Sequence, residues 1–201
     1  LLSDDAFTEI NDCTIHDAEY ALEVGENCFV DVGTSVFENN YIGVYLPPRT
    51  TPYSFQNFSI AQTEFSCPAV LLPAYTGQTS TPGDYTFAGM LLNDCQLSIS
   101  KNLFKKLNTG ISAWNSYLDV QECYFEEIQP DLKYGNMYDG SGIYINGSSN
   151  APAGLLQTGY GFGTGDPLSF YKCRYGVYGE KVNINSGYNI MDDMETGYRF
   201  L

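Results

Sequence analysis

The stretch FVDVGTSVF (29–37) decides the fold, because its pattern recurs in NFSIAQTEF (57–65), QLSISKNLF (96–104) and YLDVQECYF (117–125). In each stretch the second and fourth residues are apolar, the third is small or acidic and the ninth is aromatic. Alternation with a period of two is typical of a short strand with one buried face. The recurrence therefore predicts short strands that repeat along the chain in one register.

A fifth stretch, PLSFYKCRY (167–175), fits the same pattern and is predicted to share the register. The second residues of the five stretches are then expected to lie in a single vertical file inside the molecule: Val30, Phe58, Leu97, Leu118 and Leu168. This register leaves too few residues between Tyr175 and Met191 for another complete repeat. Either 176–179 or 182–184 would then form a shortened strand.

A second apolar strand that begins with glycine follows the aromatic residue, as in GVYL (43–46) and GISA (110–113). Where no insertion intervenes, the aromatic position recurs after 125 − 104 = 21 residues, or 37 − 15 = 22 residues counted from Ile15. A repeat this short cannot enclose a core, so neighbouring repeats must stack and bury each other's apolar faces. The helical pattern is absent, and a β-sandwich would not require one register five times.

The units SVFENNYIGVYL (35–46) and NLFKKLNTGISA (102–113) resemble the repeats of right-handed parallel β-helix proteins of the pectate-lyase-like type. The resemblance implies an all-β fold: a single-stranded right-handed parallel β-helix, or solenoid, of about six coils. We expect residues 1–201 to form a single β-helix domain, or a segment of a longer β-helix protein with neighbouring coils or domains. This architecture hosts lyases, hydrolases, adhesins and inert stalks, so the resemblance leaves the function open.

Charge narrows the classes of partner. The chain has 24 acidic and 9 basic residues, a net charge of −15. Nucleic-acid binding depends on a basic surface, and anionic membranes attract basic segments, so neither partner is expected. No apolar run approaches the roughly 20 residues that a membrane-spanning helix needs, so no membrane insertion is expected.

The adjacent Asp192 and Asp193 raise the question of a catalytic carboxylate pair. Aligning NIMDDMETGYRF (189–200) with NLFKKLNTGISA places these aspartates on Lys105 and Lys106. Other repeats hold different polar or charged residues there, so we expect a solvated corner between two strands rather than an active site.

The six cysteines follow no metal-binding pattern, and His16 is the only histidine. Two interpretations of the cysteines stay open. They are compact apolar side chains at tight turns, or Cys123 and Cys173 form a disulfide between successive coils.

Four long insertions interrupt the repeats: 47–57, 66–88, 129–141 and 146–166. All four are predicted to border the strand that begins with glycine, which makes that strand the floor of a trough. The outward residues of the floor are predicted to be Glu23, Tyr45, Leu91, Ser112 and Tyr144. The insertions would supply the walls of the trough and add four ligand-binding tyrosines, Tyr53, Tyr134, Tyr138 and Tyr160.

A trough lined with tyrosines suits a neutral glycan, whose apolar faces stack on aromatic rings. We therefore expect a secreted or cell-surface module that is structural, adhesive or glycan-binding, with a neutral glycan or surface partner and no cofactor. The alternative is a polysaccharide lyase or glycoside hydrolase that uses Glu23, Asp139 and Arg49. In this case Asp139 is a candidate ligand for a Ca²⁺ ion. An extracellular location is expected from the architecture, the scarcity of lysine and the Asn-x-Ser sequences at Asn57 and Asn146.

Overall fold

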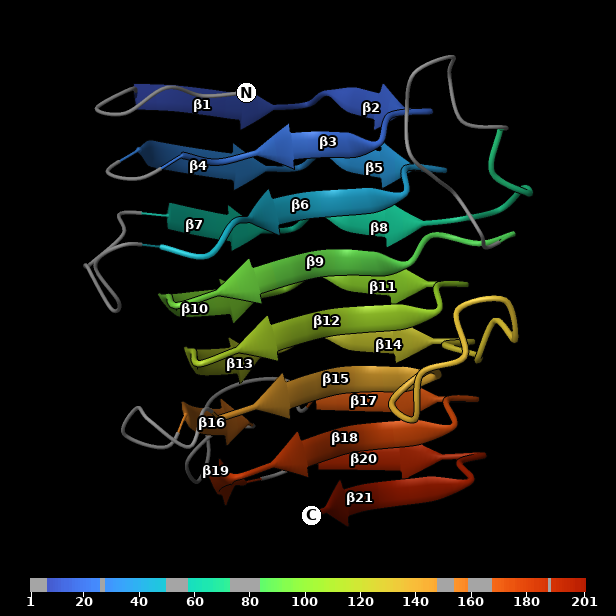
Figure 1. The fold of residues 1–201 in the computed structure, drawn as a ribbon. Helices are drawn as coiled ribbons and strands as arrows, with labels where there is room; N and C mark the ends of the chain where they lie inside the picture. The colour runs from blue at the N-terminus through green and yellow to red at the C-terminus, as the bar shows by residue number, and fades with distance from the viewer. Residues whose placement is uncertain are drawn as a thin grey trace.

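A computed structural model describes residues 7–25, 28–49, 58–72, 84–147, 154–158, 168–187 and 189–201, with the backbone alone for 154–158. These residues form three sheets of seven strands each, and every strand pairs in parallel with its neighbours (Figure 1). Each turn of the chain contributes one strand to each sheet, and the turns stack along one axis. The predicted all-β parallel β-helix is confirmed.

The strands follow each other in a fixed cycle from the first sheet to the third. The first sheet contains β1 (Phe7–Asn11), β4 (Phe29–Gly33), β7 (Phe58–Ala61), β10 (Gln96–Ser100), β13 (Tyr117–Gln121), β16 (Gly154–Thr158) and β19 (Val182–Ser186). The second contains β2 (Thr14–His16), β5 (Val36–Glu38), β8 (Glu64–Ser66), β11 (Leu103–Lys105), β14 (Tyr124–Glu126), β17 (Leu168–Tyr171) and β20 (Asn189–Asp192). The third contains β3 (Tyr20–Glu23), β6 (Ile42–Leu46), β9 (Ala88–Asn93), β12 (Thr109–Trp114), β15 (Ser141–Asn146), β18 (Tyr175–Glu180) and β21 (Thr196–Phe200).

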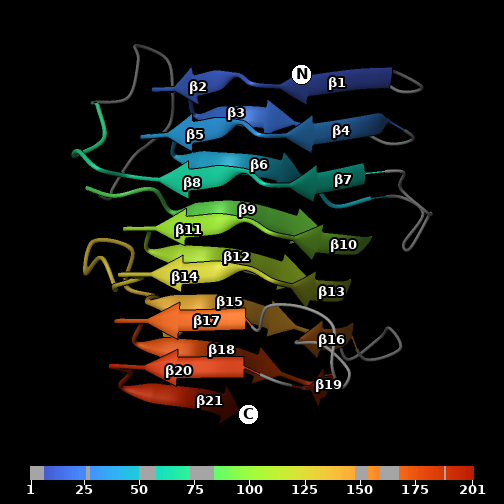
Figure 2. The same ribbon diagram turned by 180° about the vertical axis from the view of Figure 1, so that it is seen from behind.

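The winding is right-handed. In Figure 1 the strands of the third sheet run from right to left in front, and those of the other two sheets run from left to right behind, as the chain descends. Figure 2 shows the first and second sheets in front, side by side, with the third behind them. Right-handed connection is the rule for parallel strands of one sheet.

The core contains a continuous stack of phenylalanine rings, one from each of five successive strands of the second sheet. Successive ring centroids lie 5.1, 5.0, 4.8 and 4.9 Å apart, with nearly parallel planes, along the series Phe37, Phe65, Phe104, Phe125 and Phe170. Ile15 and Met191 continue the file at its two ends. The ring separation equals the distance between parallel strands, so the backbone pairing sets the stacking distance. Each fully buried ring contributes roughly 2–3 kcal/mol through the area it removes from water.

The glycine at the second position of β6, β9, β12 and β15 faces this phenylalanine stack. A Cβ atom added at Gly110 would lie 2.4 Å from the carbonyl oxygen of Gly142 and 2.7 Å from the ring of Phe125. Gly43, Gly89 and Gly142 meet equivalent contacts. The chain therefore needs glycine here so that the aromatic ring can pack beneath the backbone.

Asp192 and Asp193 lie at a corner, as predicted. Asp192 pairs in register with Tyr171, which aligns with Glu126 and Lys105 on the preceding coils. Asp193 has a left-handed φ of 52°, close to the 56° of Lys106. The chain leaves the second sheet through this conformation on coil after coil, so the two aspartates need no catalytic explanation.

The predicted register of the fifth stretch is wrong. Leu168 opens β17 in the second sheet, and Phe170 rather than Tyr175 aligns with Phe125. The partner of Leu118 in the first sheet is Leu156, in the strand β16 that lies inside the predicted 146–166 insertion. From Phe170 to Met191 the spacing is 191 − 170 = 21 residues, an ordinary coil, so neither shortened strand exists. Alternating apolar residues are common to both sheets, and the pattern alone could not tell β17 from a first-sheet strand.

Of the two open interpretations of the cysteines, the Cys123–Cys173 disulfide is not formed, since both thiols are free. Cys173 comes three residues after Phe170, as Ile128 comes three residues after Phe125, so Cys173 stands at a different corner from Cys123. Burial raises the pKa of both thiols to about 12. Cys13 alone is exposed, and the other five thiols serve as compact buried side chains.

Candidate functional site

The predicted floor of the trough is a true row on the outer face of the third sheet. Register pairs connect Glu23, Tyr45, Leu91, Ser112 and Tyr144 on successive coils. The same row continues to Tyr178 and Arg199. The row is not open along its length, however, because Ser112 and Tyr178 are fully buried and Tyr144 is 2 % exposed.

A second apolar cluster explains this burial. Tyr138, from the 129–141 insertion, stacks on Tyr144 with ring centroids 3.9 Å apart. The Tyr144 hydroxyl accepts a hydrogen bond of 3.0 Å from Asn146, and burial raises its pKa to about 12. Two of the predicted stacking platforms therefore pack against each other instead of facing solvent.

The N-terminal part of the row is more open. The rings of Tyr20 and Tyr45 stack 4.8 Å apart, and both side chains are partly exposed beside Glu23. Burial, and then the charge of Glu23, raises the pKa of Tyr45. The predicted wall residues Tyr53 and Tyr160 lie outside the described residues.

Tyr134 lies in a packed cluster of aromatic side chains. Its ring contacts Tyr41 and Phe87, and its hydroxyl donates a hydrogen bond of 2.6 Å to the carbonyl of Tyr85. Burial raises its pKa. Tyr134 thus joins the 66–88 and 129–141 insertions in their described parts.

Buried carboxylates complete the connection between these insertions. One oxygen of Asp139 accepts from the side-chain amide of Asn108 at 2.8 Å, and the other from the backbone N–H of Asn136 at 2.6 Å. Asp131 accepts from the backbone N–H of Asp84 at 2.6 Å. Within the part of the chain that the structure describes, no three His, Cys, Asp or Glu side chains are grouped to hold a metal ion. Asp139 is therefore placed to hold a loop.

The three residues named for the enzymatic alternative do not converge. Glu23 ends β3, whereas Asp139 precedes β15, and four inter-strand steps separate these strands by roughly 19 Å. Arg49 follows β6 and donates from its guanidinium to the carbonyl of Gly25 at 3.2 Å, near Glu23. A pair of glycosidase carboxylates stands roughly 5–10 Å apart, a separation that Glu23 and Asp139 exceed.

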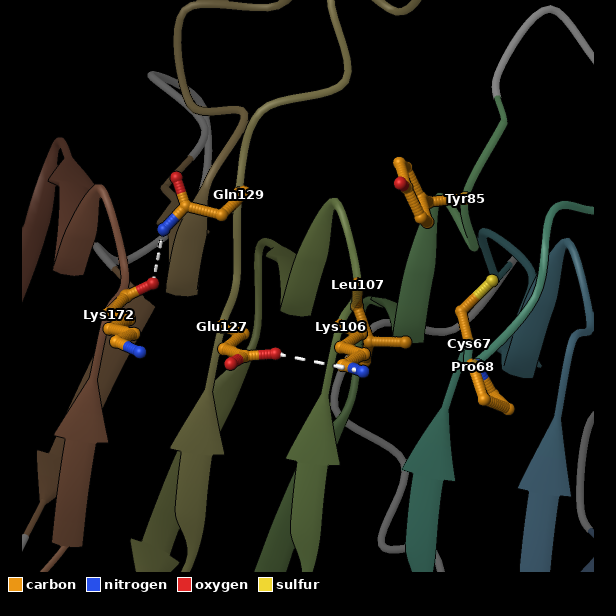
Figure 3. Close-up of a pocket in the computed structure, with 8 residues that line it drawn as sticks. All are labelled: Cys67, Pro68, Tyr85, Lys106, Leu107, Glu127, Gln129 and Lys172. Atoms are coloured by element: carbon orange, nitrogen blue, oxygen red, sulfur yellow. Dashed lines mark hydrogen bonds and ion pairs between the residues drawn. The ribbon is translucent and has the colours of Figure 1, made fainter.

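A hollow of about 440 Å³ lies instead at the corner between the second and third sheets (Figure 3). We call it the corner cleft, and it is lined by Cys67, Pro68, Tyr85, Lys106, Leu107, Glu127, Gln129 and Lys172. Figure 3 shows Lys172, Glu127 and Lys106 side by side on successive coils, with Tyr85 and Gln129 projecting from the insertions above them. The cleft therefore combines a rigid base with residues from two insertions.

Charges alternate along the base of the cleft. The ammonium group of Lys106 lies 4.0 Å from the carboxylate of Glu127, and that of Lys172 lies 4.9 Å above the ring of Tyr171. The Gln129 amide donates to the backbone carbonyl of Lys172. Hydrogen bonding to Tyr171 raises the pKa of Lys172, which stays protonated at neutral pH. The cleft thus offers cationic, anionic and amide groups beside Tyr85, which is 45 % exposed.

Sequence reasoning missed this site. The alignment of Asp193 with Lys106 did identify the corner position that forms the base. The incorrect register of 167–175 placed Lys172 at another corner, so its position beside Glu127 was hidden.

No family model, curated protein or solved structure matches this chain. A membrane-crossing helix, long and apolar over its whole length, is likewise not found among the described residues.

Proposed function

We propose that this chain is a secreted or cell-surface β-helix module of the pectate-lyase-like type, which binds glycans without processing them. The corner cleft is its ligand site. The observation that carries the proposal is the exposed Tyr85 ring, which stands over an alternating row of charges on a rigid corner. Binding sites typically pair apolar surface with a few fixed polar groups, and functional residues gather where loops meet a rigid scaffold.

Each part of the cleft matches one feature of a sugar. A pyranose ring has apolar C–H faces, which the exposed Tyr85 side chain can cover. Its hydroxyl groups both donate and accept hydrogen bonds, and Lys106, Glu127 and Gln129 provide donors and acceptors for them. The cleft spans three inter-strand steps, from Lys172 to Cys67, or roughly 14 Å. A short oligosaccharide fits this length better than a single sugar.

The Tyr20–Tyr45 stack supports a second contact for the same type of ligand. Both rings are partly exposed, and Glu23 stands beside them as a hydrogen-bond acceptor. A Tyr45→Ala variant that binds glycans as strongly as the parent protein would remove this second contact from the proposal.

A glycan array, followed by calorimetry on the retained glycans, tests the main site. Tyr85→Ala is expected to weaken binding about tenfold, because a stacking ring contributes roughly 1–1.5 kcal/mol. Tyr124→Ala is the matched control, since Tyr124 is 48 % exposed on the second sheet and does not line the cleft. Equal loss in both variants, or no glycan retained by the parent protein, would leave only a structural or adhesive role.

The enzymatic alternative has its own readout. Incubation with each retained polysaccharide, followed by analysis of released oligosaccharides, would detect lyase or hydrolase activity. We expect intact polysaccharide, and shortened products would overturn the non-enzymatic proposal.

A further inference from the structure

The charged residues that line the corner cleft are two lysines and one glutamate, so the lining has a net positive charge in an acidic protein. The chain has only 9 basic residues against 24 acidic ones, yet two lysines line this one hollow. Among the described residues, Lys172 forms no ion pair, and its ammonium group lies over the ring of Tyr171. Lys106 reaches Glu127 only at 4.0 Å, the outer limit of an ion pair. Both ammonium groups therefore retain unused hydrogen-bond donors.

We propose that the glycan bound in the corner cleft is a neutral chain with one pendant acidic group, a carboxylate or a phosphate ester. The acidic group is held between Lys106 and Lys172, outside Glu127. The inference rests on the proposed function and adds the charge of the ligand to it. Lys106 and Lys172 stand two coils apart, roughly 10 Å between backbones, a span that two lysine side chains can close around one anion.

The same surface disfavours a chain with many acidic groups. Glu127 lies between the two lysines, Asp193 lies beside Lys172 on the next coil, and the whole protein carries a net charge of −15. At physiological salt, charges more than about 8 Å apart are largely screened, so a single anion interacts mainly with the two ammonium groups and with Glu127 between them. A polyanion would place its further charges against the neighbouring carboxylates and would be repelled.

Matched sugars with and without the acidic group test the inference. The probes are lactose and 3′-sialyllactose for the carboxylate, and mannotriose and its 6-phosphate for the phosphate ester. Calorimetry in 0.05 and 0.5 M NaCl gives, for each pair, the dissociation constant of the neutral probe divided by that of the acidic probe. At the lower salt at least one acidic probe is expected to bind about tenfold more tightly than its neutral partner, and the ratio is expected to fall in high salt.

Substitutions along the row of charges should change this ratio in opposite directions. Lys106→Met and Lys172→Met are each expected to lower the ratio about three- to tenfold, because each removes one charge-assisted contact. Glu127→Gln is expected to raise it, because a competing carboxylate is lost. Lys101→Met is the control, since Lys101 pairs with Glu122 at 3.6 Å outside the cleft. Unchanged thermal unfolding would show that the variants are folded.

The outcomes separate the two proposals. Equal binding of neutral and acidic probes, with no response to Lys172→Met, would overturn this inference and leave the glycan-binding proposal standing. Tighter binding of polygalacturonate than of either acidic probe would also overturn it. Failure of every probe, together with an empty glycan array, would overturn both.

Discussion

At the scale of single residues, the fold depends on a close contact between glycine and phenylalanine. Gly110→Ala would put a Cβ atom 2.4 Å from the carbonyl oxygen of Gly142 and 2.7 Å from the Phe125 ring. Neither neighbour can move without disturbing the next coil, so we expect the free energy of unfolding to fall by about 2–3 kcal/mol. Urea denaturation followed by tyrosine fluorescence measures the change.

Gly135→Ala is the control for this substitution. Gly135 has a φ of +69°, and an added Cβ atom there would meet nothing within 4 Å. Its cost is limited to the left-handed backbone, about 1 kcal/mol. Should the two variants lose the same stability, the contact with Phe125 would not explain the glycine.

At the scale of strands and insertions, the repeated strands could be predicted from the sequence, but structure inside the insertions could not. The strands around Val30, Phe58, Leu97 and Leu118 were found because their alternating residues face one shared core. β16 was missed because it lies within a long insertion that has no aromatic ninth residue to mark it. The closure of the trough by Tyr138 could not be predicted either, because the strand period does not show where an insertion folds back.

The connection between the two insertions gives a prediction at this scale. Asp139→Ala removes the acceptor for the buried Asn108 amide and the half-buried Asn136 N–H, and leaves each with one hydrogen bond fewer. We expect a loss of about 2–3 kcal/mol in unfolding free energy and faster hydrogen exchange across residues 129–141. Asp119→Ala, which removes partly exposed hydrogen bonds to Gln121, should cost below about 0.5 kcal/mol. Exchange in 129–141 that matches the parent protein would contradict the role given to Asp139.

At the scale of the whole molecule, one core runs through every coil, and loss of any coil exposes its neighbours. The same repetition decides which parts of the candidate site could be predicted from the sequence. A row such as Glu23, Tyr45 and Tyr144 was predictable because pairing carries each position from coil to coil. The corner cleft needed a correct register and the placement of two insertions, so only the structure revealed it.

The thiols buried in this continuous core make the stability of the protein sensitive to alkaline pH. Burial raises the pKa of Cys95, Cys123 and Cys173 to about 12, against about 8.5 in an unfolded chain. Between these values the unfolded chain has lost protons that the folded protein still holds, so the free energy of unfolding must fall as pH rises. We expect constant stability near pH 7–8 and a decline from about pH 9 to 12 of roughly 1 kcal/mol per pH unit for each thiol.

Urea denaturation at a series of pH values measures the decline. A Cys95→Ala variant should show a smaller slope than Cys13→Ser, which removes the exposed thiol. Equal slopes in the two variants would contradict the assignment of the decline to buried thiols.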